Sequence, residues 1–183
     1  IRPATLRSLG PDQVLVLVNG KRRHQQALVN VQQTIGRGSA GTDINAIPLA
    51  AIHHIEVLRD GAAAQYGSDA IAGVIDIELK KSLGCEAVAG YSQYSAGDGK
   101  NYMTSAYCGI ALGDKGVIAI TGEYLDRGRS NRADADSMRI IGDTKSENKT
   151  LYVNGDYATS ATGKLYFTAG AQTRDASSAA FGR

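Results

Sequence analysis

The chain has 183 residues, of which 43% are hydrophobic and 21% charged, which is ordinary for a folded protein. Its formal net charge of +2 is too small to indicate nucleic-acid binding or attraction to an anionic membrane surface, so no nucleic-acid partner is expected. Glycine is abundant, at 22 residues, and 9 tyrosines far outnumber 2 phenylalanines. This composition is typical of a β-rich chain with many tight turns.

The first segment, residues 1 to about 81, has mixed α and β character. Val14–Val18 is a continuous run of valine and leucine that ends at Asn19 and Gly20, which predicts a buried strand followed by a turn. A glycine-rich loop and two further strands are predicted at residues 36–43, 55–58 and 74–79.

From about residue 82 the hydrophobic pattern has a period of two, and turn signals recur regularly. Five strands are predicted, over residues 86–94, 101–112, 117–126, 149–159 and 164–175. The connections between them are a hairpin loop, a tight turn, a long polar loop and a second hairpin turn, at residues 95–100, 113–116, 127–147 and 160–163.

The alternation separates two kinds of side chain. In the third predicted strand one face carries Ile118, Ile120 and Tyr124. The other face carries Ala119, Thr121 and Glu123. Strands of about ten residues with one apolar and one polar face are typical of a transmembrane β-barrel. A soluble antiparallel sheet with one wet face alternates in the same way, so the alternation alone leaves both interpretations open.

The two cysteines fall on neighbouring predicted strands. If the hairpin loop spans residues 95–100, Tyr94 faces Asn101, and Cys85 then lies opposite Ile110. That register places Cys85 one diagonal step from Cys108 on the same face. A disulfide would need a shifted register or a local twist, and two free thiols are the alternative.

The motifs that could carry chemistry lack a supporting context. Residues 36–41 fit the G-x-G-x-x-G dinucleotide pattern, but that loop must open a helix, and Pro48 leaves little room for one. His53 and His54 are adjacent, so on a strand they are expected to point to opposite faces and cannot hold one metal together. The sequence therefore predicts no enzyme, no metal site and no cofactor.

Residues 47–81, IPLAAIHHIEVLRDGAAAQYGSDAIAGVIDIELKK, resemble the end of the plug domain of TonB-dependent outer-membrane receptors. The positions in step with the family pattern, to which the resemblance gives a structural role, include Glu56, Arg59, Gly61, Tyr66, Gly67 and Gly73. Ser8 stands where that family usually has glycine. If the position requires a positive φ, Ser8 should strain or reshape its loop.

The resemblance implies an α+β plug domain with a small mixed sheet over residues 1–81, with its N-terminal part missing. Antiparallel β hairpins of an incomplete transmembrane β-barrel would follow over residues 82–183, which supply about five of the family's 22 strands. The implied location is the cell outer membrane.

The resemblance also implies a function, namely energy-coupled uptake of a scarce ligand, with a ferric siderophore favoured over other small nutrients. The implied partners are that ligand, outer-membrane lipid, and the TonB complex of the inner membrane, whose contact segment is missing here. In this family the apical loops of the plug touch the ligand, and by position the candidates are Gln13, Gln32, Gln33, Arg37 and Ser39. The alternative is a soluble β-rich periplasmic or secreted binding module with no transport role.

Overall fold

The computed structural model describes residues 3–31, 36–133 and 141–177. The chain divides into two units, Ile1–Lys80 (unit 1) and Lys81–Arg183 (unit 2). No helix in these described ranges is long and apolar enough to cross a membrane.

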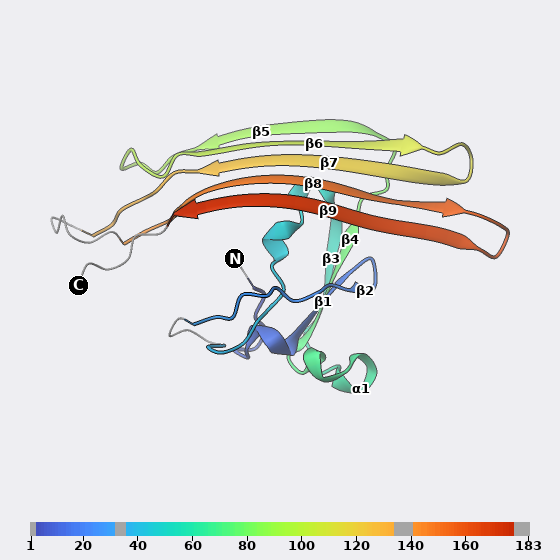
Figure 1. Ribbon diagram of the computed structural model, residues 1–183, viewed down its shortest axis with the longest axis horizontal. Coiled ribbons are helices and arrows are strands. Elements are labelled where there is room, and N and C mark those ends of the chain that lie inside the picture. The colour runs from blue at the N-terminus through green and yellow to red at the C-terminus, as the bar shows by residue number, and fades with distance from the viewer. Residues whose placement is uncertain (1–2, 32–35, 134–140, 178–183) are drawn as a thin grey trace. The chain divides into compact units, whose positions relative to one another are not determined.

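Unit 1 is built on a four-stranded mixed sheet with the order β2-β1-β4-β3 (Figure 1). Its strands are β1 (Val14–Val18), β2 (Lys21–Arg22), β3 (Ile52–Leu58) and β4 (Gly73–Leu79). Short helical turns precede or connect them: η1 (Pro11–Gln13), η2 (Ile44–Ala46), η3 (Leu49–Ala51), α1 (Ala63–Tyr66) and η4 (Ser68–Ala70). β1 runs parallel to β4, whereas β2 and β3 are antiparallel to their neighbours. The predicted mixed α+β character is thus confirmed.

The core of unit 1 forms around β1, whose five residues are all buried. Leu15 and Leu17 pack with Val74 from β4 and with alanines from the helical connection, and Tyr66 covers this cluster. A strand with neighbours on both sides and cover on both faces needs apolar residues at every position. This requirement explains the uninterrupted valine and leucine run.

The glycines of the plug-like motif lie where backbone geometry requires them. Gly67 ends α1 with a φ of 93°. Gly73 opens β4 with a φ of 140°, and a Cβ there would lie 2.3 Å from the carbonyl oxygen of Leu58. Since β3 and β4 pair at this point, a side chain at Gly73 would push the two strands apart.

The described residues of unit 2 form an open, five-stranded antiparallel sheet whose strands follow one another in sequence order (Figure 1). Its strands are β5 (Gly84–Ser92), β6 (Asn101–Ala111), β7 (Gly116–Arg127), β8 (Lys145–Ala158) and β9 (Lys164–Ser177). The predicted hairpins are confirmed, although β8 begins four residues before its predicted start at Lys149. The fold is therefore a plug-type domain with a small mixed sheet, followed by antiparallel β hairpins.

The register of the first hairpin differs from the predicted one by two residues. Ser92, not Tyr94, faces Asn101, and Cys85 consequently lies directly opposite Cys108. The two cysteines form a disulfide, so the predicted diagonal placement of Cys85 is wrong. The physical reason is the turn, because Tyr94 belongs to the loop, where its amide donates to the carbonyl oxygen of Asp98.

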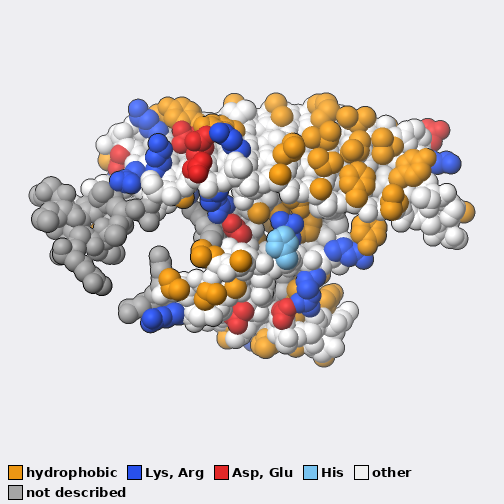
Figure 2. All heavy atoms as spheres, in the orientation of Figure 1, with side chains coloured by type: hydrophobic (Ala, Val, Ile, Leu, Met, Phe, Trp, Pro, Cys, Tyr) orange, Lys and Arg blue, Asp and Glu red, His pale blue; other side chains and the backbone are white. Residues whose placement is uncertain are grey.

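The registers of β6 to β9 align two chemically different faces. The apolar face carries Ala106, Ile110, Ile118, Ile120, Leu151, Val153, Leu165, Phe167, Ala169 and Ala171. The polar face carries Ser105, Tyr107, Thr121, Glu123, Thr150, Asn154, Asp156, Thr168, Gln172 and Arg174. Figure 2 shows hydrophobic side chains gathered over the strands of unit 2. The predicted partition of Ile118 and Ile120 from Thr121 is confirmed.

Exposure does not follow polarity in unit 2. On the apolar face Leu151 is 53% exposed and Leu165 60% exposed, whereas Thr121 and Asn154 on the polar face are each 1% exposed. A sheet folded for water would show the reverse. Large contiguous exposed apolar surfaces of this kind mark contact with lipid or with another protein surface.

Candidate ligand-binding loops and their surroundings

Two loops that are distant in sequence meet at Pro11, which is buried in η1. A Cβ on Gly36 would lie 2.3 Å from Cδ of Pro11, and a Cβ on Gly41 would lie 2.7 Å from Cβ of Pro11. Only glycine lets the 36–41 loop close onto Pro11 at both points. The loop before β1 and the glycine-rich loop therefore form one packed cluster at the N-terminal end of β1.

Backbone hydrogen bonds hold the glycine-rich loop in a hairpin-like shape. The amide of Asn30 donates to the carbonyl oxygen of Ser39 at 2.9 Å, and the amide of Gly38 donates to the carbonyl oxygen of Asn30 at 2.8 Å. Further down, the amide of Gln26 donates to the carbonyl oxygen of Gly41 at 3.0 Å. These bonds fix the position of the turn at residues 36–38.

Of the five candidate ligand contacts, Gln13, Arg37 and Ser39 fall within this loop cluster. Gln13 is half-buried at the end of η1, and its carbonyl oxygen accepts from the amide of Ala72 at 2.9 Å. Arg37 is exposed at the tip of the turn. The hydroxyl of Ser39 donates to the carbonyl oxygen of Gly36 at 2.6 Å, so it stabilises the turn itself.

The remaining two candidates, Gln32 and Gln33, lie outside the described residues. The three that are described differ in how free their side chains are to reach a ligand. Arg37 presents its charge to solvent, whereas Ser39 is half-buried and engaged in its own loop. Arg37 is consequently the described candidate best placed for a ligand.

The dinucleotide-like pattern has a different physical explanation. Gly36 and Gly41 are needed for packing on Pro11, and Gly38 has a φ of 89° at the turn. The loop leads into η2, a three-residue 3-10 turn, rather than into a helix long enough to present its N-terminus to a phosphate. The spacing of these glycines therefore reflects loop geometry.

A strained backbone precedes this cluster. Arg7 and Ser8 have φ values of 55° and 59°, in the left-handed region that glycine occupies freely. The expectation that Ser8 occupies a position suited to glycine is confirmed.

An ion pair that the sequence did not predict links β2 to the motif after α1. The guanidinium of Arg22 pairs with the carboxylate of Asp69 and donates to the carbonyl oxygen of Tyr66 at 2.9 Å. Arg22 follows the tight turn at Asn19, and nothing in its sequence neighbourhood points to a partner 47 residues away.

The prediction that His53 and His54 point to opposite faces is wrong. A register shift between Ile52 and His54 places an extra residue in β3, and the two imidazole rings lie 5.0 Å apart in an edge-on arrangement. A β-bulge of this kind interrupts the alternation of side chains. His54 Nε2 then lies 3.2 Å from Oε1 of Glu56, while Arg59 lies just beyond the end of β3.

In unit 2, charged side chains join the loop after β5 to the loop after β7. The guanidinium of Arg132 forms two hydrogen bonds with the carboxylate of Asp98, at 2.8 and 3.1 Å, and lies over the ring of Tyr94, 4.8 Å from its centre. The hydroxyl of Tyr94 in turn donates to Asp143 at 2.7 Å. We call these four residues the loop clamp.

The loop clamp shifts the titration of its members. The pKa of Asp98 is lowered, chiefly because Arg132 hydrogen-bonds to its ionised carboxylate. The pKa of Tyr94 is raised, chiefly because its hydroxyl proton is held by Asp143. Both shifts favour the protonation states in which the clamp is closed.

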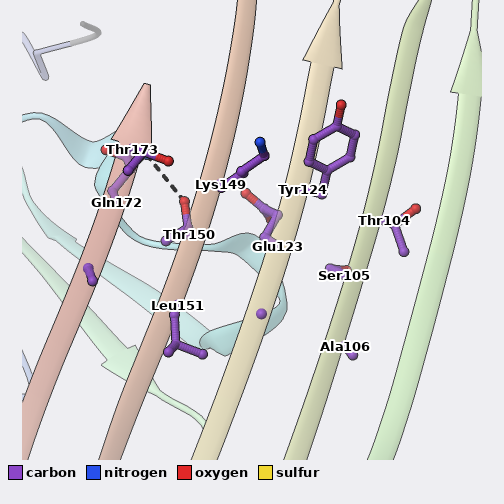
Figure 3. Close-up of a pocket in the computed structure, with 12 residues that line it drawn as sticks. Thr104, Ser105, Ala106, Glu123, Tyr124, Lys149, Thr150, Leu151, Gln172 and Thr173 are labelled. Atoms are coloured by element: carbon purple, nitrogen blue, oxygen red, sulfur yellow. Dashed lines mark hydrogen bonds between the residues drawn. The ribbon is translucent and has the colours of Figure 1, made fainter. Parts of the chain in front are cut away.

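The apolar face carries an open depression of about 570 Å³ (Figure 3). Small residues form its floor, namely Ala106, Gly122 and Ala171, and Leu151 lies between Gly122 and Ala171 in the strand register. Close by, Figure 3 shows the Gln172 amide donating to the hydroxyl of Thr150 at 3.3 Å. An open depression with an apolar floor suits hydrocarbon chains better than a polar substrate.

Comparison with known proteins agrees with this architecture. Residues 2–74 match the TonB-dependent Receptor Plug Domain family. The probable TonB-dependent siderophore receptor PirA of Acinetobacter baumannii is 42% identical over 80 residues, which cover 44% of this chain and 10% of that protein. The vitamin B12 transporter BtuB of Vibrio cholerae is 35% identical over 130 residues, which cover 69% of this chain and 19% of that protein.

Among solved structures, the ferric enterobactin receptor PfeA of Pseudomonas aeruginosa in complex with enterobactin superimposes with a TM-score of 0.71 at 25% identity. The match covers 91% of this chain and 26% of that receptor. The mixed sheet, the loop cluster and the following hairpins thus define a receptor plug domain with adjoining β hairpins. Residues 2–74 belong to the plug-domain family of TonB-dependent receptors, and the hairpins that follow share the fold of such a receptor. It spans between a tenth and about a quarter of the length of these relatives.

Proposed function

We propose that this chain contributes the plug and the first barrel strands of an outer-membrane receptor for energy-coupled nutrient uptake. The proposed boundary places the plug in residues 1–81 and the barrel strands in residues 82–183. The plug-family match over residues 2–74, followed directly by hairpins with an exposed apolar face, is the observation that supports it most strongly. The proposed location is the outer membrane, with lipid against the apolar face.

The division of labour follows from the two kinds of sheet. Unit 1 has a buried aliphatic core and a loop cluster with an exposed cation, which suits a domain that meets a soluble ligand. Unit 2 has apolar residues facing outward in alternation, which suits a wall in hydrocarbon. Neither unit, over its described residues, brings together groups for bond-making chemistry, and the relatives are named as receptors and transporters, so the proposed activity is binding and transport.

The favoured ligand is a ferric siderophore. Two of the relatives are named as siderophore or ferric enterobactin receptors. Vitamin B12 is the second candidate, because the similarity to BtuB extends over 69% of this chain. The charge of the ligand separates the two, since Arg37 would attract an anionic ferric chelate through charge-assisted hydrogen bonds.

The proposed contacts are Gln13, Gln32, Gln33, Arg37 and Ser39, with Arg37 as the main charged contact. The rigid packing of Gly36 and Gly41 on Pro11 would hold the turn in position before the ligand arrives. A preformed loop loses less conformational entropy on binding than a loop that must first be ordered. The TonB complex is the proposed partner that supplies energy for release and passage of the ligand.

The test uses the full receptor that contains this chain, purified in detergent, with ferric enterobactin and cyanocobalamin as probes in separate titrations. We expect ferric enterobactin to bind and Arg37→Gln to weaken it about tenfold, the loss typical of one charge-assisted hydrogen bond. Lys115→Gln is the matched control, because it removes one exposed positive charge from the tight turn between β6 and β7. Binding of cyanocobalamin alone would replace the siderophore with the second candidate, and binding of neither would contradict both ligand assignments.

The soluble-module alternative has its own test. If unit 2 faces lipid, the receptor should stay dispersed only in detergent or lipid. A receptor that remains monomeric in detergent-free buffer and unfolds cooperatively there would favour the alternative.

A further inference from the structure

The first residues of unit 2 are held against the polar face of its sheet. The ammonium of Lys81 lies 3.0 Å from Oδ2 of Asp156 in β8. The hydroxyl of Tyr107, on β6, donates to the carbonyl oxygen of Ser82 at 2.8 Å. The segment that enters β5 is thus attached to two different strands before β5 begins.

The sheet is shaped to receive this segment. A Cβ on Gly109 would lie 1.9 Å from the carbonyl oxygen of Ser82, so any other residue at that position would displace the chain. Tyr107 is 3% exposed, which leaves its hydroxyl fixed beside the crossing point. Close backbone approach over a glycine, next to a fixed donor, makes the path of residues 81–82 specific.

Asp156 is the central charge of this attachment. Its side chain is 12% exposed, and Oδ2 lies 3.0 Å from both Lys81 and Lys164. A carboxylate removed from water in this way needs partners, and the two lysines supply them from different parts of the chain. Lys81 comes from the connection between the units, whereas Lys164 opens β9 within the sheet.

A covalent attachment follows within four residues. Cys85 in β5 is bonded to Cys108 in β6. β5 follows directly on the segment that leaves unit 1, so a pull on that segment acts on the N-terminal end of β5. Such a pull would reach the Lys81–Asp156 ion pair and the Tyr107 hydrogen bond before it reached the disulfide.

We infer that Lys81 and Ser82 form a mechanical anchor, which stops rearrangement of unit 1 from propagating into β5. The inference rests on the proposed function, because it assumes that the plug moves during transport. The anchor ends the moving part of the chain at Lys80. A force that displaces unit 1 then reaches Asp156 and Tyr107 through short, fixed contacts and leaves the β5–β6 pairing intact.

The experiment compares two lysines that contact the same oxygen at the same distance. In the full receptor, hydrogen exchange of the amides of residues 82–84 is measured by mass spectrometry for Lys81→Met and for Lys164→Met. We expect Lys81→Met to accelerate exchange there on the order of threefold, the effect of one partly exposed ion pair. Lys164→Met should leave it unchanged, since Lys81 still holds Asp156. Tyr107→Phe should accelerate it as Lys81→Met does, because only the hydroxyl is lost.

The anchor is refuted if both lysine variants accelerate exchange equally, or if neither does. It is also refuted if exchange in the middle of β7 rises as much as at residues 82–84, because the loss would then belong to the whole sheet. The measurement needs no ligand and no transport. A receptor that fails to bind ferric enterobactin would therefore count against the proposed function while the anchor could still pass its own test.

Discussion

The two units use apolar residues in opposite ways. In unit 1 the valines and leucines of β1 are at most 7% exposed, and this central strand carries no charged residue. In unit 2 Leu151 and Leu165 are more than half exposed, while Thr121 and Asn154 are buried. The difference shows that the number of hydrophobic residues in a sheet does not indicate its surroundings. The face of the sheet on which those residues lie, and whether that face is buried or exposed, does indicate them.

The two units also differ in backbone strain. Within the described part of unit 1, positive φ angles occur at Arg7, Ser8 and Asn19 as well as at glycines. Within the described part of unit 2 they occur at glycines alone. The described loops of unit 1 therefore contain stored backbone strain, whereas the described turns of unit 2 place their positive φ angles at glycines, which adopt them at little cost.

The largest expected effect comes from breaking the packed interior of unit 1 at Gly73. Gly73→Ala should destabilise the unit by about 4 kcal/mol, because it combines a strained φ with a clash against the backbone of Leu58. Chemical denaturation of the full receptor, followed by hydrogen exchange of β1 and β4, measures the loss.

Gly38→Ala is the control for this prediction. Gly38 also has a positive φ, of 89°, but a Cβ added there would have no atom within 4 Å of it. Its substitution should cost about 1 kcal/mol from backbone conformation alone. Equal losses at the two positions would show that the clash at Gly73 is relieved without cost.

The second-largest effect is expected when a charge is placed on the apolar face of unit 2. Ala169→Arg places a charge on the apolar face, and it should reduce the free energy of folding into lipid vesicles by about 3 kcal/mol if that face meets hydrocarbon. Thr168→Arg changes the adjacent residue of β9, which is also exposed but points to the other face, and should be tolerated. Similar losses from both variants would contradict contact between the apolar face and lipid.

Sequence patterns predict where the strands lie better than they predict which residues of two strands face each other. The run at Val14–Val18 and the alternation around Ile120 are local consequences of burial, and they were located correctly. The β5–β6 register was missed because the sequence does not show that Tyr94 belongs to the turn, with its hydroxyl bonded to Asp143. Register depends on turn geometry, and an error of two residues keeps every side chain on its own face, so the pattern gave no warning.

The sequence also does not predict contacts between segments that are far apart in the chain. Gly36 and Gly41 were recognised as a motif, but their packing on Pro11 depends on a fold that no local pattern encodes. The bulge that brings His53 beside His54 is likewise invisible in an apolar and polar pattern. Ser8 is the exception, since its departure from a family glycine predicted its positive φ.

A smaller effect is expected when the backbone strain at Ser8 of unit 1 is relieved. Ser8→Gly should stabilise unit 1 by about 1 kcal/mol, since glycine adopts the left-handed conformation without the Cβ penalty. Asn19→Gly is the matched variant, and it should gain less because asparagine tolerates this region and its side chain accepts from the amide of Leu79 at 2.9 Å. Denaturation midpoints of the two variants measure the difference. A loss of stability in Ser8→Gly would mean that the serine side chain contributes more than its strain removes.

The smallest effect concerns the loop clamp, which orders unit 2 outside its strands. Arg132 lowers the pKa of Asp98, so the carboxylate stabilises the folded loops above its unfolded-state pKa of about 3.9. That contribution is lost as the pH falls through the lower folded-state pKa, and the clamp should stay closed at neutral and mildly acidic pH.

Asp98→Asn should mimic the acid state at pH 7. The amide of Asn131 donates to Oδ2 of Asp98 at 2.8 Å, so its hydrogen exchange should accelerate on the order of threefold. Asp114→Asn removes the same charge from the turn between β6 and β7 and should leave Asn131 unchanged. If Asp114→Asn accelerates exchange at Asn131 equally, net charge rather than the Asp98–Arg132 geometry orders these loops.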